Sequence, residues 1–287
     1  ITVGARAHGS LNIDDTDLLA LPVPLPQGDH SLKEQQKIAD CLSSLDTLIA
    51  AQADKLDALK THKRGLMQQL FPREGETIPR LRFPKFRGTR EWDLKPLSQY
   101  FGNIRNGFVG TATPHYVPSG IAYLQGKNIK KGQIDTAGLF FVSSEFHQGQ
   151  KKSQLHVGDV LMVQSGHVVE CAVVDEKFSG ANCHALIILP PKDKVHSTFF
   201  VQYFYSPHGR KKISNITTGN TIKHILASDV KSLIVCVPSS KEQQKIGDFL
   251  SSLDTLIAAQ VDKLDALKTH KKGLMQQLFP NPEAVAA

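Results

Sequence analysis

Residues 33–72 read KEQQKIADCLSSLDTLIAAQADKLDALKTHKRGLMQQLFP, and residues 241–280 read KEQQKIGDFLSSLDTLIAAQVDKLDALKTHKKGLMQQLFP. The two stretches differ at four of their 40 positions, and equivalent positions lie 208 residues apart. That offset is far longer than the repeat of a solenoid protein, which is about 20 to 50 residues. The chain therefore carries one element twice, on either side of a large insert. The differing pairs are Ala39/Gly247, Cys41/Phe249, Ala53/Val261 and Arg64/Lys272.

Both copies have the apolar spacing of a long helix. Apolar side chains recur at steps of four and three residues, which is the heptad pattern of a coiled coil. Each copy ends at a Phe-Pro pair and contains no earlier proline. Forty helical residues at 1.5 Å per residue give a rod of roughly 60 Å. The predicted seam residues are Ile38, Leu42, Leu45, Ile49, Leu56, Leu59, Leu66 and Leu70 in the first copy, and Ile246, Leu250, Leu253, Ile257, Leu264, Leu267, Leu274 and Leu278 in the second.

The natural partner of each helix is its twin, because an isolated helix would leave the apolar stripe exposed. The order of the segments along the chain favours an antiparallel pair with a pseudo-two-fold axis. Polar residues interrupt the seam at Gln52 and Lys63, and again at Gln260 and Lys271, and we expect them to fix the register. Further apolar residues flank the seam. They either cover the core of the helix pair or rest on the neighbouring domain, or they receive helices of a partner protein. These are Leu48, Leu256, Phe249, Met67 and Met275.

The insert between the two helices is rich in β-strand signals. Short apolar runs lie at 121–124, 139–142, 160–163, 172–174, 185–189 and 233–237, whereas residues 198–206 fit either a helix or a strand. Residues 17–26 resemble residues 229–238, since each is an apolar run that ends in proline and precedes a KEQQKI helix. The expected fold class is α+β, with a β-rich domain and two long helices in an antiparallel coiled coil. The expected boundaries are 1–32, 33–72, 73–240, 241–280 and a tail at 281–287.

The positive charge of the chain is concentrated in the insert. The whole chain has a net charge of +7, while residues 73–240 hold 21 basic and 12 acidic residues, a net charge of +9. Such a domain favours a polyanion such as DNA, although a basic domain without a nucleic-acid role has the same composition. The four cysteines form no CxxC pair, which argues against zinc and indicates reduced thiols in a cytoplasmic protein. No apolar run is long enough to span a bilayer.

Catalytic motifs are missing from the sequence. There is no phosphate-binding P-loop, no GxGxxG after a strand, and no Asn-Pro-Pro-aromatic run of an adenine methyltransferase. We therefore expect no cofactor, no metal and no catalytic residue. The remaining candidates are basic and amide side chains at turns, which are the types that contact phosphates and base edges. The predicted DNA-binding residues are Arg105, Asn106, Lys127, Asn128, Lys130, Lys131, Gln164, Ser165, His167, Asn182, His184, Lys211, Lys212, Asn220, Lys223 and His224.

The chain resembles the specificity subunits of type I restriction-modification enzymes. The resemblance rests on the duplicated KEQQKI helix, on EWDLKPLSQYF and GIAYLQGKNIKKGQID, and on HVGDVLMVQSGH and TTGNTIKHI. It covers nearly the whole chain. In such a subunit, residues 1–32 correspond to the end of a first target-recognition domain and residues 73–240 to a second.

The resemblance implies a non-catalytic subunit that reads one half of a bipartite target in double-stranded DNA. The helices then act as a spacer that docks methyltransferase subunits, and the restriction subunits join indirectly. The sequence departs from the family at the front, where only the end of a first recognition domain corresponds. One expectation is that the chain is truncated. The other is that two copies form a homodimer, which would read a palindromic target. A coiled-coil scaffold with a protein-binding β-domain, or an enzyme, are the alternative interpretations.

Overall fold

A computed structural model describes residues 4–5, 11–12, 16, 19 and 25–279. The chain forms two units, residues 1–58 together with 258–287, and residues 59–257, and each is described separately. The described helices are α2 (Ser31–Leu70), α3 (Ser144–Gly149), α4 (Ser197–Tyr205), α5 (Pro207–Asn215), α6 (Ala227–Ser232) and α7 (Ser240–Leu278). The described strands are β1 (Gly4–Ala5), β2 (Leu11–Asn12), β3 (Asp93–Pro96), β4 (Arg105–Asn106), β5 (Tyr116–Val117), β6 (Ile121–Leu124), β7 (Ile129–Lys130), β8 (Gln133–Ile134), β9 (Phe140–Val142), β10 (Val160–Val163), β11 (Cys171–Val173), β12 (Asn182–Cys183), β13 (Leu186–Leu189) and β14 (Ile234–Val237).

The two repeat copies form helices α2 and α7, as predicted. Every predicted seam residue is buried or half-buried. In the first unit the side-chain amide of Gln52 donates to that of Gln260, and Lys271 pairs with Asp46. In the second unit Lys63 pairs with Asp254. The residue numbers rise along one helix as they fall along the other, so each unit contains an antiparallel part of the helix pair.

The polar contacts of the seam are symmetric between the two copies. Gln52 contacts Gln260, its equivalent in the other copy. The two ion pairs are equivalent to each other, since each joins the aspartate of one copy to the lysine of the other. An antiparallel pair in the correct register satisfies all of these groups. A slipped register would leave amides and charges without partners at a partly buried seam, which is unfavourable. The register is therefore specified by polar contacts as well as by apolar packing.

Two four-stranded sheets form the frame of the second unit. The first has the order β11-β10-β13-β4 with antiparallel neighbours, and its strands β10 and β13 are buried along their full length. The second has the order β12-β6-β9-β5. Continuous apolar runs such as Val-Leu-Met-Val explain the burial, since both faces of these strands are covered. All six strand-like runs noted in the sequence contain strands of this frame or of the β14-β3 pair.

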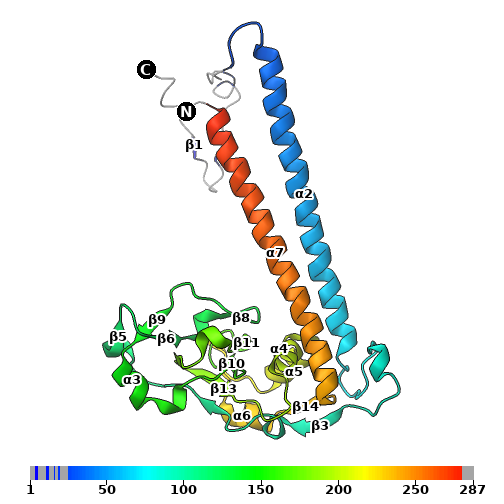
Figure 1. The fold of residues 1–287 in the computed structure, drawn as a ribbon, viewed down its shortest axis with the longest axis vertical. Helices are drawn as coiled ribbons and strands as arrows, with labels where there is room; N and C mark the ends of the chain where they lie inside the picture. The colour runs from blue at the N-terminus through cyan, green and yellow to red at the C-terminus, as the bar shows by residue number, and fades with distance from the viewer. Residues whose placement is uncertain (1–3, 6–10, 13–15, 17–18, 20–24, 280–287) are drawn as a thin grey trace. The chain divides into compact units, whose positions relative to one another are not determined.

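Aromatic residues of α4 form the centre of the larger core. The segment at 198–206, which the sequence left open between helix and strand, is a helix whose Phe199, Phe200, Tyr203 and Phe204 are fully buried. They pack with Phe71 and with the start of α7, so α4 and α5 lie beside that end of α7 (Figure 1). Burying a large apolar side chain contributes about 1.5–3 kcal/mol. This core therefore fixes the domain on the ends of both long helices that belong to the same unit.

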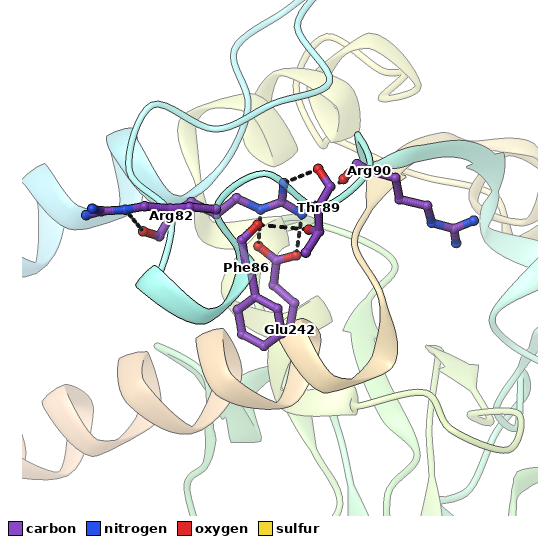
Figure 2. Close-up of polar contacts among 6 residues, drawn as sticks. Arg82, Phe86, Thr89, Arg90 and Glu242 are labelled. Atoms are coloured by element: carbon purple, nitrogen blue, oxygen red, sulfur yellow. Dashed lines mark hydrogen bonds and ion pairs between the residues drawn. The ribbon is translucent and has the colours of Figure 1, made fainter.

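A buried ion pair attaches the first turn of α7 to the segment that follows α2. Arg82 donates from two nitrogens to the two carboxylate oxygens of Glu242, each at 2.7 Å, and Glu242 is 1% exposed (Figure 2). The same guanidinium donates to the backbone carbonyls of Thr89 and Arg90, both at 3.1 Å. The hydrogen bonds to Glu242 raise the pKa of Arg82. All the charge that folding buries here is matched by opposite charge and hydrogen bonds.

Differences between the repeat copies follow their surroundings. Glu34 is exposed, whereas its equivalent Glu242 is buried against Arg82. Cys41 is exposed, whereas Phe249 contacts the ring of Phe83 with centroids 5.5 Å apart. The flanking residues Leu48, Leu256 and Met275 are exposed, and Met67 is buried. The second copy has thus adapted to a domain that packs on its first turns.

The sequence predicts an apolar, strand-like run that ends in proline before each long helix, and the described residues cover this run fully only before α7. Residues 17–26 lie largely outside the described residues. In the other copy, residues 234–237 form β14 before Pro238, but residues 229–232 belong to helix α6. The strand-proline-helix order is therefore present before α7, with a shorter strand than the sequence suggested. The tail at 281–287 lies outside the described residues.

Candidate nucleic-acid interface

Two loops that are far apart in the sequence are joined at the surface of the second unit. We call residues 164–167 and 217–225 the paired loops. Four backbone hydrogen bonds hold them. Ile225 donates to Gln164 at 3.0 Å, Gly166 donates to Lys223 at 2.8 Å, and within the second loop Thr218 and His224 donate to each other, both at 2.8 Å. A side-chain contact adds to these, because Ser165 Oγ lies 2.7 Å from His224 Nδ1. The first loop follows β10 directly, so the central buried sheet positions both loops.

The paired loops present the donors and acceptors that base edges and phosphates require. Ser165, His167, Asn220, Lys223 and His224 are all exposed, and Gln164 is half-buried. Hydroxyl, amide and imidazole groups can read base edges, and lysine can hold a phosphate. Six of the sixteen residues predicted from the sequence therefore share one surface. Their sequence separation gave no indication of this contact.

A glycine shapes the tip of the second loop. Gly219 has a φ of +89°, and a Cβ at this position would lie 2.2 Å from the carbonyl oxygen of Ile222. We expect Gly219→Ala to distort the loop, because an L-residue is strained there by about 1–2 kcal/mol before the clash is counted. DNA binding should lose sequence preference, while thermal unfolding shifts only slightly because the loop is exposed. Gly180→Ala, also at positive φ but with open space around it, is the control, and equal effects of both on DNA preference would contradict the loop assignment.

The lysines around β7 and β8 are also exposed but are arranged differently. Lys127 lies over the ring of Phe140, 4.0 Å from its centroid, and Lys130 pairs with Asp135 at 2.8 Å. Lys131 occupies the turn between the two strands with a φ of 52°. These three ammonium groups remain accessible to a phosphate, and they stay predictions as DNA contacts.

Two predicted base readers are instead buried parts of the frame. Asn128 is 0% exposed, donates to the carbonyl of Asp135 at 3.0 Å, and accepts from the backbone of Gln125 at 3.0 Å. Asn182 is also 0% exposed, and its amide donates to Ser153 Oγ at 2.8 Å. Because their polar atoms are occupied inside the fold, these amides cannot reach a base edge. The structure assigns them to loop stability, which corrects the prediction.

The remaining candidates are partly engaged within the protein. Arg105 donates to the carbonyls of Lys152 and Gln154 at 2.7 and 3.2 Å, so its guanidinium also serves a structural role. His184 lies 3.1 Å from the hydroxyl of Tyr123, and burial lowers the pKa of its imidazole. Lys211 pairs with Glu74, which lowers the pKa of that carboxyl. Asn106 is exposed and Lys212 is half-buried.

The described residues offer little for catalysis. Within the ranges that the structure describes, no group of three His, Cys, Asp or Glu side chains is placed to hold a metal ion. In the same ranges, no helix is both long and apolar enough to cross a bilayer. Cys171 and Cys183 are free thiols whose burial raises their pKa, so they are poor nucleophiles.

The fold is that of a β-rich domain attached to one end of each of two long, nearly identical helices. Residues 91–269 match the family model of the type I restriction modification DNA specificity domain. The chain belongs to this family, which confirms the resemblance drawn from the sequence.

Individual relatives agree with this assignment. The putative type I restriction enzyme MjaX specificity subunit of Methanocaldococcus jannaschii is 25% identical over 282 residues, which are 96% of this chain and 63% of that protein. The solved S subunit of a type I restriction-modification system from M. genitalium has a TM-score of 0.62 at 16% identity, over 94% of this chain and 66% of the other. The HsdS subunit from Thermoanaerobacter tengcongensis has a TM-score of 0.57 at 16% identity, over 96% and 64%. The chain thus spans 63 to 66% of the length of these proteins.

Proposed function

We propose that the chain is a non-catalytic specificity subunit whose recognition domain reads one half of a bipartite DNA target through the paired loops. The observation that carries this proposal is the joining of two polar loops on one surface of a basic domain. Direct readout needs several donors and acceptors at a fixed spacing, and the backbone hydrogen bonds between the loops supply that spacing. Membership of a DNA specificity family supports the same reading.

The helices α2 and α7 are proposed to act as a spacer and as the docking surface for methyltransferase subunits. Leu48 and Leu256 occupy equivalent positions in the two copies and are 46% and 42% exposed. Exposed leucines on an otherwise paired helix are suited to receive further helices. The restriction subunits would join through the methyltransferase. Two copies of the chain would bring two identical recognition domains, and hence an inverted repeat as target.

Selection from a randomised duplex library tests this function directly. The purified chain is mixed with a cognate methyltransferase subunit, bound duplexes are sequenced, and light scattering gives the stoichiometry. We expect enrichment of a short motif, repeated in inverted orientation across a fixed gap if two copies assemble. A single half-site would indicate one working domain. Tight binding to the methyltransferase without any enriched sequence would contradict DNA reading and favour a scaffold.

Substitutions in the paired loops localise the readout. Asn220→Ala and Lys223→Gln should relax or change the enriched base at particular positions, since each would remove a base contact worth about 1–3 kcal/mol. Lys194→Asn is the matched control, because Lys194 is also exposed but lies in another loop. If the loop variants enriched the same motif as the unmodified chain, the bases would be read by another surface of the domain.

A further inference from the structure

A basic groove lies within the second unit. It has a volume of about 540 Å³ and is walled by the last turns of α2, the β7–β8 turn, the start of α5 and residues near the end of the β10–β11 loop. Five basic and two acidic side chains line it. One of the acidic residues, Asp254, is neutralised by its ion pair with Lys63. The groove therefore keeps an excess of positive charge.

A hydrogen-bond network holds the wall of the groove in a fixed shape. The hydroxyl of Tyr205 donates to Glu170 Oε2 at 2.8 Å and accepts from the backbone of Gly132 at 2.9 Å. The same carboxylate oxygen accepts from the backbone of Lys131 at 2.5 Å. Lys131 adopts a φ of 52°, which is unusual for a residue other than glycine, asparagine or aspartate. The turn is thus held in a strained conformation that places a lysine in the groove wall, as is common at functional sites.

Two further cations line the same groove. Arg210 donates from Nε to the carbonyl of Tyr205 at 3.1 Å, and its guanidinium lies 5.3 Å from the Tyr205 ring centroid. These contacts orient the guanidinium but leave its terminal nitrogens for a ligand. Arg64 comes from α2. Within the part of the chain that the structure describes, neither Arg64 nor Lys131 forms a side-chain ion pair. Three oriented or unpaired cations around one groove are suited to phosphate oxygens.

Two chain segments that line the groove lead into the paired loops. Glu170 closes the loop that contains Ser165, and its backbone donates to the carbonyl of His167 at 2.9 Å. Helix α5, which carries Arg210, ends at Asn215, just before the second loop. Both connections are short, so residues of the groove wall lie within a few residues of each paired loop along the chain.

We propose that this groove binds backbone phosphates of DNA that flank the half-site read by the paired loops, with Arg64, Lys131 and Arg210 as the contacts. The inference rests on the proposed function. Phosphate contacts position a protein on the duplex without reading its sequence. The groove then contributes affinity and orientation, while the paired loops contribute preference.

The test uses the full chain and fluorescence anisotropy on two duplexes, one with the selected motif and one with the same composition in scrambled order. We expect the variant Arg64→Gln/Lys131→Asn/Arg210→Gln to bind both duplexes roughly tenfold or more weakly. The slope of log affinity against log salt should fall by about 2 to 3, because each lost phosphate contact removes about 0.9. The ratio of affinities for the two duplexes should stay as in the unmodified chain. Asparagine at 131 tolerates the left-handed backbone, so the turn is kept.

The matched control is Lys85→Gln/Lys177→Gln/Lys194→Asn. It removes the same charge from exposed lysines outside the groove and includes an asparagine at another left-handed position, since Lys194 has a φ of 64°. An equal loss in the control would overturn the groove in favour of the general field of the domain. If the groove variant kept its affinity for DNA and its sequence preference, the proposal that the groove binds phosphates would fail, while the proposed function would stand. Loss of methyltransferase binding instead of DNA binding would assign the groove to a protein ligand. If the unmodified chain bound neither duplex, the proposed function and the groove would both fail.

Discussion

Glu242→Ala is expected to lower the free energy of unfolding by about 3–5 kcal/mol, because it leaves the buried guanidinium of Arg82 without its counter-charge. Arg82 would keep its bonds to the carbonyls of Thr89 and Arg90, but two charge-assisted bonds of 2.7 Å would be lost. The pKa of Arg82 is raised by those same bonds, so the guanidinium stays charged throughout the accessible pH range. Urea or thermal unfolding of the second unit measures the loss.

The chain provides its own control for this prediction. Glu34 occupies the equivalent position in the other copy, within the same KEQQKI sequence, and is exposed. Glu34→Ala should change stability by no more than about 0.5 kcal/mol, as most surface substitutions do. Equal losses from both variants would mean that the effect comes from the helix sequence and not from the ion pair. A neutral Glu242→Ala would show that the pair with Arg82 contributes nothing.

Gly247→Ala is expected to destabilise the protein by about 1–3 kcal/mol even though alanine is the better helix former. A Cβ at Gly247 would lie 2.6 Å from Thr198 Oγ1, 2.9 Å from the backbone nitrogen of Phe199 and 3.3 Å from its Cα. Backbone atoms cannot move aside as a side-chain end can, so α7 and α4 would have to separate. Thermal unfolding should show a lower midpoint. An increase in stability would mean that the two helices are not in such close contact.

Ala39→Gly is the reciprocal change at the equivalent position. Ala39 is exposed on α2, so glycine there should cost only about 1 kcal/mol through its lower helix propensity. Gly247→Ala and Ala39→Gly therefore both destabilise the protein, but the first does so through a steric clash and the second through lower helix propensity. Together the variants separate helix propensity from packing against α4.

The long helices and the fold class could be predicted because their signal is local and periodic. The heptad spacing from Ile38 to Leu70 repeats every two turns, and the seam residues are buried or half-buried. The strand at 160–163 was equally clear, since a run of apolar residues with turn signals on both sides is typical of a buried strand. Helices α3, α5 and α6 have six, nine and six residues, which is too short for a helical pattern to stand out, so the sequence did not predict them.

The candidate site could be predicted only in part. Residue type indicated that Ser165 and His224 belong to a polar surface, but nothing in the sequence showed that two residues 59 positions apart share a hydrogen bond. The same reasoning selected Asn128 and Asn182, whose amides are buried. Residue type gives the chemistry of a side chain, whereas burial depends on tertiary contacts with distant segments. Tyr205 and Glu170 were missed for that reason.

The polar contacts of the helix seam are self-complementary. Gln52 faces its own equivalent, and each aspartate of one copy faces the lysine of the other. Each helix therefore carries the glutamine, the aspartate and the lysine that these contacts require. It can pair with an identical helix that runs in the opposite direction. Reversing the charge of Asp46 alone would create a clash with Lys271, and reversing Lys271 as well would remove it. Substitutions at the seam are thus coupled between two segments that lie 208 residues apart in the sequence.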